Sequence, residues 1–402
     1  MAVGILRREA GAGIDPRAAW LLPLAFVPYV AVATIDWHVP AEGYAPFFPV
    51  WLACTAVALV GWTVVRARPG ALETLAVAVV VAMLLTDLTS FWTQGLRDLH
   101  LYVKAGAHFA AGLPVYQQEL LTARPADLSD YPYLYPPPTL PILAVLSKLP
   151  SILVDLGWVA GSLGAVVWAL SRLGLGRTFV LLFLAWPPVL QGLYVGNVAV
   201  PLFAVFVAGP VFGAGLVLST MVKPYSGIAA LWLPREGRWR DLVLGLLIVA
   251  AWIVVTLPLV GVDLWAQWWT GIALYRQSQA LLPTSLYGIG LGRWLPELVT
   301  IAIGIVVVVL ALGRRRLAGL WRLGIATIVA SPSLFSHGFI VAIPSIAGLR
   351  RTVFWVVLAI TSVAPGAQWF VAIGVLIAAW YVPALGRDRP VGAPVDGPSV
   401  AA

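Results

Sequence analysis

The sequence predicts an all-α protein built as a polytopic transmembrane helix bundle. Of its 402 residues, 61% are hydrophobic and only 10% are charged, whereas a soluble domain carries roughly 25% charged residues. Glycine and proline are frequent, with 38 and 31 residues, as is common in membrane helices. Several apolar runs reach the roughly 20 residues that a spanning helix needs. A bilayer can bury this much apolar surface, and a soluble fold of this size cannot.

Three apolar runs precede the first long polar segment, at about 19–36, 46–65 and 72–92, and we expect each to span the membrane. Short basic clusters separate these and later apolar runs, which is the pattern of the positive-inside rule. Placing the clusters in the cytoplasm puts most of the 25 lysines and arginines there. Both termini then lie inside, with roughly 12–14 helices in all. The net charge of +8 therefore indicates membrane topology and not nucleic-acid binding.

Two later regions interrupt this regular pattern. Residues 136–150 are short and bounded by prolines, so they could form a re-entrant or interfacial helix in place of a span. Residues 211–234 contain Lys223–Pro224 near their centre, and we expect two short helices that meet there. No linker divides the chain, so residues 1–385 are expected to form a single transmembrane domain, and residues 386–402 a disordered cytoplasmic tail.

One long polar segment, the first outer loop at about 93–135, is left on the extracytoplasmic side. We expect it to be partly helical, with an amphipathic helix over 97–111 that lies along the membrane surface. Its expected apolar stripe is Leu99, Val103, Ala107 and Ala110. Its polar side chains recur at spacings of three and four and so share a face: Arg97, His100, Lys104 and His108.

Asp98 stands at the start of this expected helix, beside Arg97. The helix N-terminus and the guanidinium both favour its ionised form, which is the form that a general base needs. The alternative interpretation is an ordinary acidic residue on the solvated face of a helix N-terminus. The single cysteine, Cys54, permits no intrachain disulfide and no zinc site of the usual ligand count. No carboxylate cluster in the sequence is dense enough to demand a metal ion, and we expect neither a metal nor a cofactor.

Four short motifs occur in an order that resembles glycosyltransferase family 87, whose members have the GT-C fold. The first is Asp98-Leu-His-Leu-Tyr102, followed by Gly112, Tyr116 and Tyr135-Pro-Pro137; the others are Gly196-Asn197, Lys223-Pro224, and Ser331-Pro332 with His337. The fragment DLHLYV is especially similar to the mycobacterial polyprenyl-phosphate-mannose-dependent members that elongate phosphatidylinositol mannosides. The resemblance runs from about residue 85 to about residue 345.

This resemblance implies an inverting glycosyltransferase that takes a sugar, mannose first, from a polyprenyl-phosphate donor to a lipid or glycan acceptor in the cell membrane. It implies that Asp98 is the base and that His337 and Lys223 face the donor phosphate. Arg97 and Lys104 are added as phosphate-binding candidates by their spacing. The motifs also imply substrate-binding roles for Tyr102, His100, Tyr135 and Asn197.

Several alternatives stay open at this point. Lys223 could extend to the outer interface as lysines near helix ends do, and His337 could cap a helix end. Asp87 and the tryptophans near Asp263 suit an interfacial position. Arabinofuranose is the competing sugar within the family. A lipid or sugar transporter is the competing class, but it predicts ionisable residues at the membrane midplane, and here they gather at the ends of apolar runs.

Overall fold

The structure is a computed structural model that describes residues 80, 95–117, 132–279, 290–291, 295–331, 335–362 and 367–386. The three expected N-terminal spans, apart from Val80, lie outside these residues, as do Cys54, Asp87 and the tail beyond Gly386. Within the described residues the chain is helical, with one isolated β-bridge between Leu349 and Gly386 and no strand. The all-α prediction is therefore confirmed for this part of the chain.

The chain forms two compact units, and each is described by itself. The first comprises Met1–Phe91, Leu173–Pro187 and Pro344–Ala402, and the second Trp92–Arg172 and Pro188–Ile343. The helices described in the first unit are α9 (Arg177–Ala185), most of α18 (Ile343–Ala347), α19 (Arg351–Ser362) and α20 (Ala367–Ala378). The single domain expected over residues 1–385 stays a prediction.

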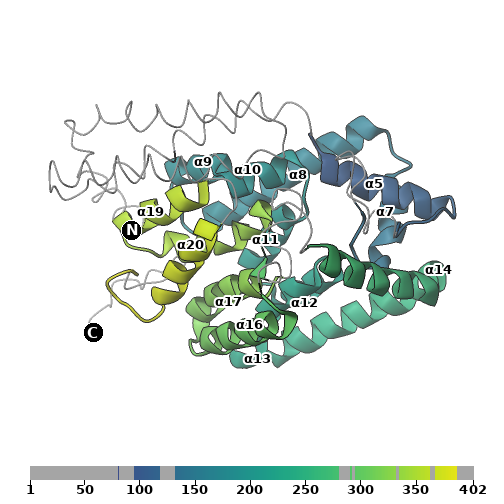
Figure 1. Ribbon diagram of the computed structural model, residues 1–402. Coiled ribbons are helices and arrows are strands. Elements are labelled where there is room, and N and C mark those ends of the chain that lie inside the picture. Colours follow the sequence, from purple (N-terminus) through teal and green to yellow (C-terminus); the bar gives the residue numbers. More distant parts are fainter. Residues whose placement is uncertain are drawn as a thin grey trace, which may run out of the picture. The chain divides into compact units, whose positions relative to one another are not determined.

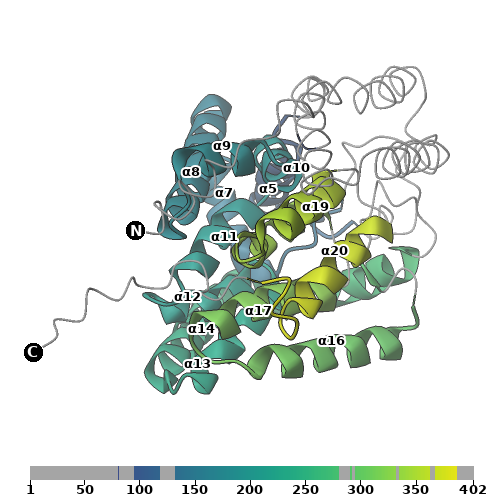
Figure 2. The ribbon, with the colours of Figure 1, turned by 90° about the vertical axis from the view of Figure 1, so that its left-hand side faces the viewer.

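The second unit holds every described residue of the candidate site. Its longer helices are α5 (Arg97–Ala110), α8 (Ser151–Arg172), α10 (Pro187–Tyr194), α11 (Ala199–Ala208), α14 (Trp239–Gln279), α16 (Glu297–Leu312) and α17 (Arg316–Ala330). Its short elements are η4 (Pro137–Thr139), α7 (Leu140–Leu146), α12 (Gly213–Leu218), η5 (Ser219–Met221), η6 (Pro224–Leu231), α13 (Trp232–Arg235) and η8 (Ser336–Ala342). Helices α16 and α17 lie side by side as a hairpin (Figures 1 and 2).

Two of the described helices are long and apolar enough to cross a membrane, at Ser151–Arg172 and Trp239–Tyr275. Large apolar side chains are exposed along α14 and α16, including Val255 at 70% and Leu298 at 81%. A surface of this kind suits contact with lipid better than contact with water. The expected count of roughly 12–14 membrane helices stays a prediction.

The buried face of α5 differs from the expected one. The sequence predicted an apolar stripe of Leu99, Val103, Ala107 and Ala110, whereas the buried residues are Leu99, Tyr102, Ala105 and Gly106. The reason is the close packing of α5 on α7. A Cβ atom at Gly106 would lie 2.3 Å from the backbone carbonyl of Leu143, so only glycine permits this approach. The absence of a side chain at Gly106, and not local hydropathy, therefore decides which face of α5 is buried.

Helix α14 turns back on itself and holds the proline-rich segment that precedes α7 (Figure 1). Gly261 has φ 68° and ψ 165°, which ends the first helical part shortly after Pro258. Trp252 in the first part donates its indole N–H to the carbonyl oxygen of Pro138 at 3.1 Å. Trp268 in the second part donates to the carbonyl oxygen of Leu134 at 3.0 Å. Prolines have no backbone N–H to donate, so the segment has few donors of its own. The two indoles of α14 supply donors for its carbonyl oxygens.

The loops before α14 and before α17 meet at what we call the basic end, formed by Trp232–Arg238 and Leu312–Arg316. Arg235 donates its Nε–H to the carbonyl oxygen of Leu312 at 2.9 Å, which satisfies a carbonyl at the C-terminus of α16. Trp232 donates to the carbonyl oxygen of Arg316 at 2.9 Å, and the Arg316 N–H donates to the Glu236 carboxylate at 2.8 Å. Two of the basic clusters that the sequence analysis assigned to the cytoplasm thus lie together: Arg235, Arg238 and Arg240 with Arg314, Arg315, Arg316 and Arg322.

Arg238 joins a third segment to the basic end. Its Nη1 donates to the carbonyl oxygens of Gly209 and Pro210, at 2.9 and 2.8 Å, just after the last turn of α11. Its Nε and Nη2 face the Asp241 carboxylate at 2.6 Å, and its guanidinium lies 5.2 Å from the centre of the Trp232 ring. Helix α11 therefore has its C-terminus at the basic end.

Candidate functional site

The N-terminus of α5 is joined to the C-terminus of α10. The amide nitrogen of Leu96 donates to the carbonyl oxygen of Tyr194 at 2.7 Å, and that of Asp98 donates to the carbonyl oxygen of Val195 at 2.8 Å. The first turn of a helix has N–H groups without intrahelical partners, and the last turn has such carbonyls. Here each set partly satisfies the other, which fixes the first turn of α5 against residues 194–195.

Gly196 makes this junction possible. Its φ is 71°, a left-handed backbone that other residues adopt at a cost. A Cβ atom at this position would also lie 2.9 Å from the Cβ atom of Leu99. The turn lies directly beside α5, and the next side chain, Asn197, reaches Asp98.

Four polar side chains form one hydrogen-bonded series, which we call the polar chain: Arg97, Asp98, Asn197 and Lys223. The Nε and Nη2 groups of Arg97 each donate to Oδ1 of Asp98 at 3.1 Å. The Nδ2 group of Asn197 donates to Oδ2 of Asp98 at 2.5 Å, and Oδ1 of Asn197 accepts from the Lys223 ammonium at 3.0 Å. The contact between Asp98 and Arg97 that the sequence predicted is confirmed.

The carboxylate of Asp98 keeps room for one more donor. Its two oxygens offer about four acceptor positions, and Arg97 and Asn197 fill three of them. Its side chain is 14% exposed, so it is neither fully buried nor on a solvated face. A hydroxyl group that approached this carboxylate could donate to the remaining position.

Lys223 lies where the sequence predicted a break between two short helices, and the break is confirmed. Its backbone is extended, with φ −129° and ψ 102°, between η5 and η6. Ser226 donates its hydroxyl to the carbonyl oxygen of Lys223 at 2.6 Å and contacts the hydroxyl of Ser219 at 2.7 Å. The N–H of Lys223 donates to the carbonyl oxygen of Ser219 at 2.9 Å. These contacts fix the turn that aims the ammonium at Asn197.

His337 lies near the polar chain at the start of η8, outside the two candidate spans. Its ring stacks on Phe335 with 5.5 Å between ring centres and 4° between planes. Burial is the main reason that its pKa lies well below the usual value, and the positive charges of Lys223 and Arg97 lower it further. At neutral pH the imidazole is therefore neutral, so it could hydrogen-bond a phosphate but would not add a charge.

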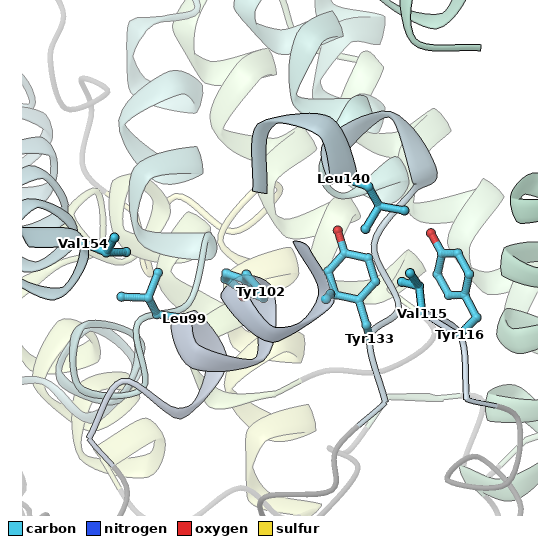
Figure 3. Packing of buried hydrophobic residues seen from close by; sticks show 8 residues of the cluster. Leu99, Tyr102, Val115, Tyr116, Tyr133, Leu140 and Val154 are labelled. Atoms are coloured by element: carbon cyan, nitrogen blue, oxygen red, sulfur yellow. The ribbon is translucent and has the colours of Figure 1, made fainter. Parts of the chain in front are cut away.

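Four tyrosines gather in a buried cluster, the first of them one turn after Asp98; Figure 3 shows Tyr102, Tyr116 and Tyr133, and Tyr135 packs against them. The hydroxyls of Tyr102 and Tyr135 lie 2.8 Å apart, and Tyr116 donates to the carbonyl oxygen of Tyr135 at 2.7 Å. Tyr133 packs against Tyr116 with ring centres 5.8 Å apart. Burial raises the pKa of Tyr102 and Tyr135, and the negative charge of Asp98 adds to both shifts. Both phenols therefore stay protonated and can donate hydrogen bonds.

Two residues chosen from the sequence lie apart from this group. Lys104 is exposed on α5. His100 is exposed and faces the Asp155 carboxylate of α8 at 3.1 Å. Tyr225, which the sequence analysis did not select, is close enough to Tyr135 to affect its pKa. Its position two residues after Lys223 was the only signal that could have indicated it. Across the described ranges no group of three or more His, Cys, Asp or Glu side chains could hold a metal ion.

The comparison with family sequence models decides the broad identity. The model of glycosyltransferase family 87 matches residues 133–336, just over half of the chain. The chain belongs to glycosyltransferase family 87. Comparisons with curated proteins and with solved structures each found no match. This member of family 87 is therefore a membrane glycosyltransferase with a sugar donor and an acceptor as substrates.

The matched residues of this family 87 protein include Tyr135, Asn197 and Lys223, whereas Asp98 precedes them and His337 follows them. Asp98 is nevertheless bonded directly to the matched part through Asn197. The polar chain thus connects Asp98, outside the matched residues, to Asn197 and Lys223 within them.

Proposed function

We propose that this family 87 enzyme transfers a sugar, mannose first, from a polyprenyl-phosphate donor to a hydroxyl of a lipid or glycan acceptor. The reaction inverts the configuration at the anomeric carbon and takes place on the extracytoplasmic face. The observation that carries the proposal is the link from the Asp98 carboxylate to the Lys223 ammonium through Asn197. It offers a proton acceptor and a cation within one site, as such a transfer requires.

In the proposed reaction the acceptor oxygen bonds to the anomeric carbon while the bond from that carbon to the phosphate oxygen breaks. The hydroxyl proton passes to the Asp98 carboxylate, and polyprenyl phosphate leaves with the bonding electron pair. Lys223 and Arg97 stabilise the negative charge that develops on the phosphate. Neutral His337 adds a hydrogen bond. Lys104 and His100 have no part in this proposal because both are exposed and lie apart from the polar chain.

The extracytoplasmic location is supported by the position of the basic end. Helix α11 connects the polar chain with the basic end, because it begins two residues after Asn197 and ends where Arg238 binds the carbonyl oxygen of Gly209. The positive-inside rule assigns the basic end to the cytoplasm, which puts the polar chain toward the opposite face.

The deciding experiment is a transfer assay with purified protein and a synthetic polyprenyl-phosphate sugar, with Asp98→Asn as the control. Mannose and arabinofuranose donors are compared, because arabinofuranosyl transfer is the alternative within the family. A glycosylated product with inverted anomeric configuration, formed from the mannose donor and absent with the variant, supports the proposal. Product from the arabinofuranose donor alone rejects mannose. Movement of donor across vesicle membranes without any product would favour a transporter.

A further inference from the structure

Asn197 is the link of the polar chain with the least room for a substrate. It is 3% exposed, and its side-chain oxygen already accepts two hydrogen bonds. One comes from the Lys223 ammonium at 3.0 Å and the other from the backbone N–H of Ala199 at 2.8 Å. Its amide nitrogen donates to Asp98 at 2.5 Å. The oxygen has only two lone pairs, so it has no capacity left for a sugar hydroxyl.

The orientation of this amide follows from its neighbours. An ammonium group and a backbone N–H only donate hydrogen bonds, and an ionised carboxylate only accepts them. The oxygen of Asn197 must therefore face Lys223 and Ala199, and the nitrogen must face Asp98. An amide is the neutral group that satisfies both partners at once, whereas a carboxylate or an ammonium would repel one of them.

We propose that Asn197 is a positioning residue that aims the Asp98 carboxylate and the Lys223 ammonium while keeping the two charges from pairing directly. This inference rests on the proposed function, because it assigns Asp98 the role of base and Lys223 the role of phosphate ligand. It replaces the substrate-binding role that the motif resemblance implied for Asn197. An amide between the two charges leaves the carboxylate an open acceptor position and the ammonium two N–H groups for the substrates.

Two variants separate this role from a structural one. Asn197→Asp keeps an oxygen for Ala199 and Lys223 but presents a second carboxylate to Asp98. Two carboxylates that share a site hold a proton between them. The acid limb of the kcat profile should therefore move to higher pH by about one unit or more. Asn197→Ser keeps an acceptor for the turn but is too short to reach Asp98. It should lower kcat about 10- to 100-fold, with the donor KM within about threefold.

The controls make each failure distinguishable. Thr327→Val, which removes a buried hydroxyl that donates to the Leu323 carbonyl oxygen within α17, should leave the pH profile unchanged. Wild-type transfer by Asp98→Asn would reject the proposed base. An unshifted profile for Asn197→Asp, with Asp98→Asn inactive, would reject only the positioning role.

Two further results also bear on the role of Asn197. A raised KM with unchanged kcat in Asn197→Ser would mean that the amide binds substrate, which overturns the proposal. If Asn197→Asp shows no transfer at any pH, activity in the uncharged Asn197→Ser supports the proposal and its absence overturns it.

Discussion

The amide nitrogen of Asp98 lies 2.8 Å from the carbonyl oxygen of Val195, so the start of α5 and the end of α10 form one continuous hydrogen-bonded junction. The junction fixes the backbone of Asp98, while Arg97 and Asn197 fix its carboxylate. The backbone and the side chain of Asp98 are therefore held by separate sets of contacts. The site is thus largely organised before any substrate binds.

Gly196→Ala tests that junction. The new methyl group must adopt a backbone with φ 71° and would lie 2.9 Å from the Cβ atom of Leu99. We expect the unfolding free energy in detergent to fall by about 2–4 kcal/mol, with a parallel loss of transfer because Asn197 moves away from Asp98. Gly237→Ala is the matched control, since φ is 73° but nothing lies within 4 Å. It should cost only about 1 kcal/mol. Equal losses would mean that the contact with Leu99 contributes nothing.

Trp268→Phe tests how the proline-rich segment is held. The indole N–H of Trp268 donates to the carbonyl oxygen of Leu134 at 3.0 Å, next to Tyr135. Phenylalanine keeps the ring but leaves that carbonyl without this donor, so we expect a loss of about 1–2 kcal/mol in thermal unfolding. The neighbouring Trp269 is 70% exposed, and Trp269→Phe should change stability by less than about 0.5 kcal/mol. A larger effect at Trp269 would contradict this account.

The proposed topology can be tested by cysteine labelling. After replacement of Cys54 by alanine, a single cysteine is placed at Ala107, which is exposed on α5, or at Gly237 in the basic end. With the basic end in the cytoplasm, an impermeant thiol reagent added to intact cells should label Ala107→Cys and spare Gly237→Cys. After permeabilisation both should react. Labelling of Gly237→Cys alone in intact cells would invert the proposed orientation.

His337 should make the protein sensitive to mild acid. Its pKa is lowered in the folded state by burial and by Lys223 and Arg97, whereas in the unfolded chain it is about 6.5. Below about pH 6.5 the unfolded state therefore binds more protons, and the free energy of unfolding falls as the pH falls. Between pH 7 and 5 the melting temperature of the wild type should drop more than that of His337→Gln. Parallel curves would place the pH dependence elsewhere.

Local sequence signals predicted the parts of the site that depend on neighbouring residues. The start of α5, the contact of Arg97 with Asp98 and the break at Lys223–Pro224 all follow from helix-terminus chemistry and from proline. The bond between Asn197 and Asp98 joins residues 99 positions apart, and no local pattern records such a pairing.

Two features that the sequence did not predict have the same physical origin. The buried face of α5 was predicted from hydropathy, but it is decided by the approach of Gly106 to Leu143. The resemblance implied that His337 faces the donor phosphate, but it did not indicate that the imidazole is neutral. Its neutral state depends on burial and on two cations from distant segments. Both features arise from packing between elements, which periodicity within one element does not encode.

Asp98→Asn is the test of the proposed base. The acceptor hydroxyl must lose its proton as the bond between sugar and phosphate breaks, and a positioned base typically contributes 10²–10⁴-fold. An amide keeps the shape of the carboxylate but cannot take up the proton. Transfer should therefore fall by about 100-fold or more. The donor should bind almost as it does to the wild type, measured by binding of polyprenyl-phosphate sugar to purified protein.

The variant also changes the polar chain in a way that can be checked. Arg97 and Asn197 both donate to Asp98. The N–H groups of the new amide must therefore face the N–H groups of one of these two residues, which should cost about 1–3 kcal/mol of stability. Asp155→Asn is the matched control: among the described residues that carboxylate pairs with exposed His100, and its replacement should affect transfer little. If Asp98→Asn transfers sugar at the wild-type rate while Asp155→Asn does not, the proton passes to a different acceptor and the polar chain serves binding alone.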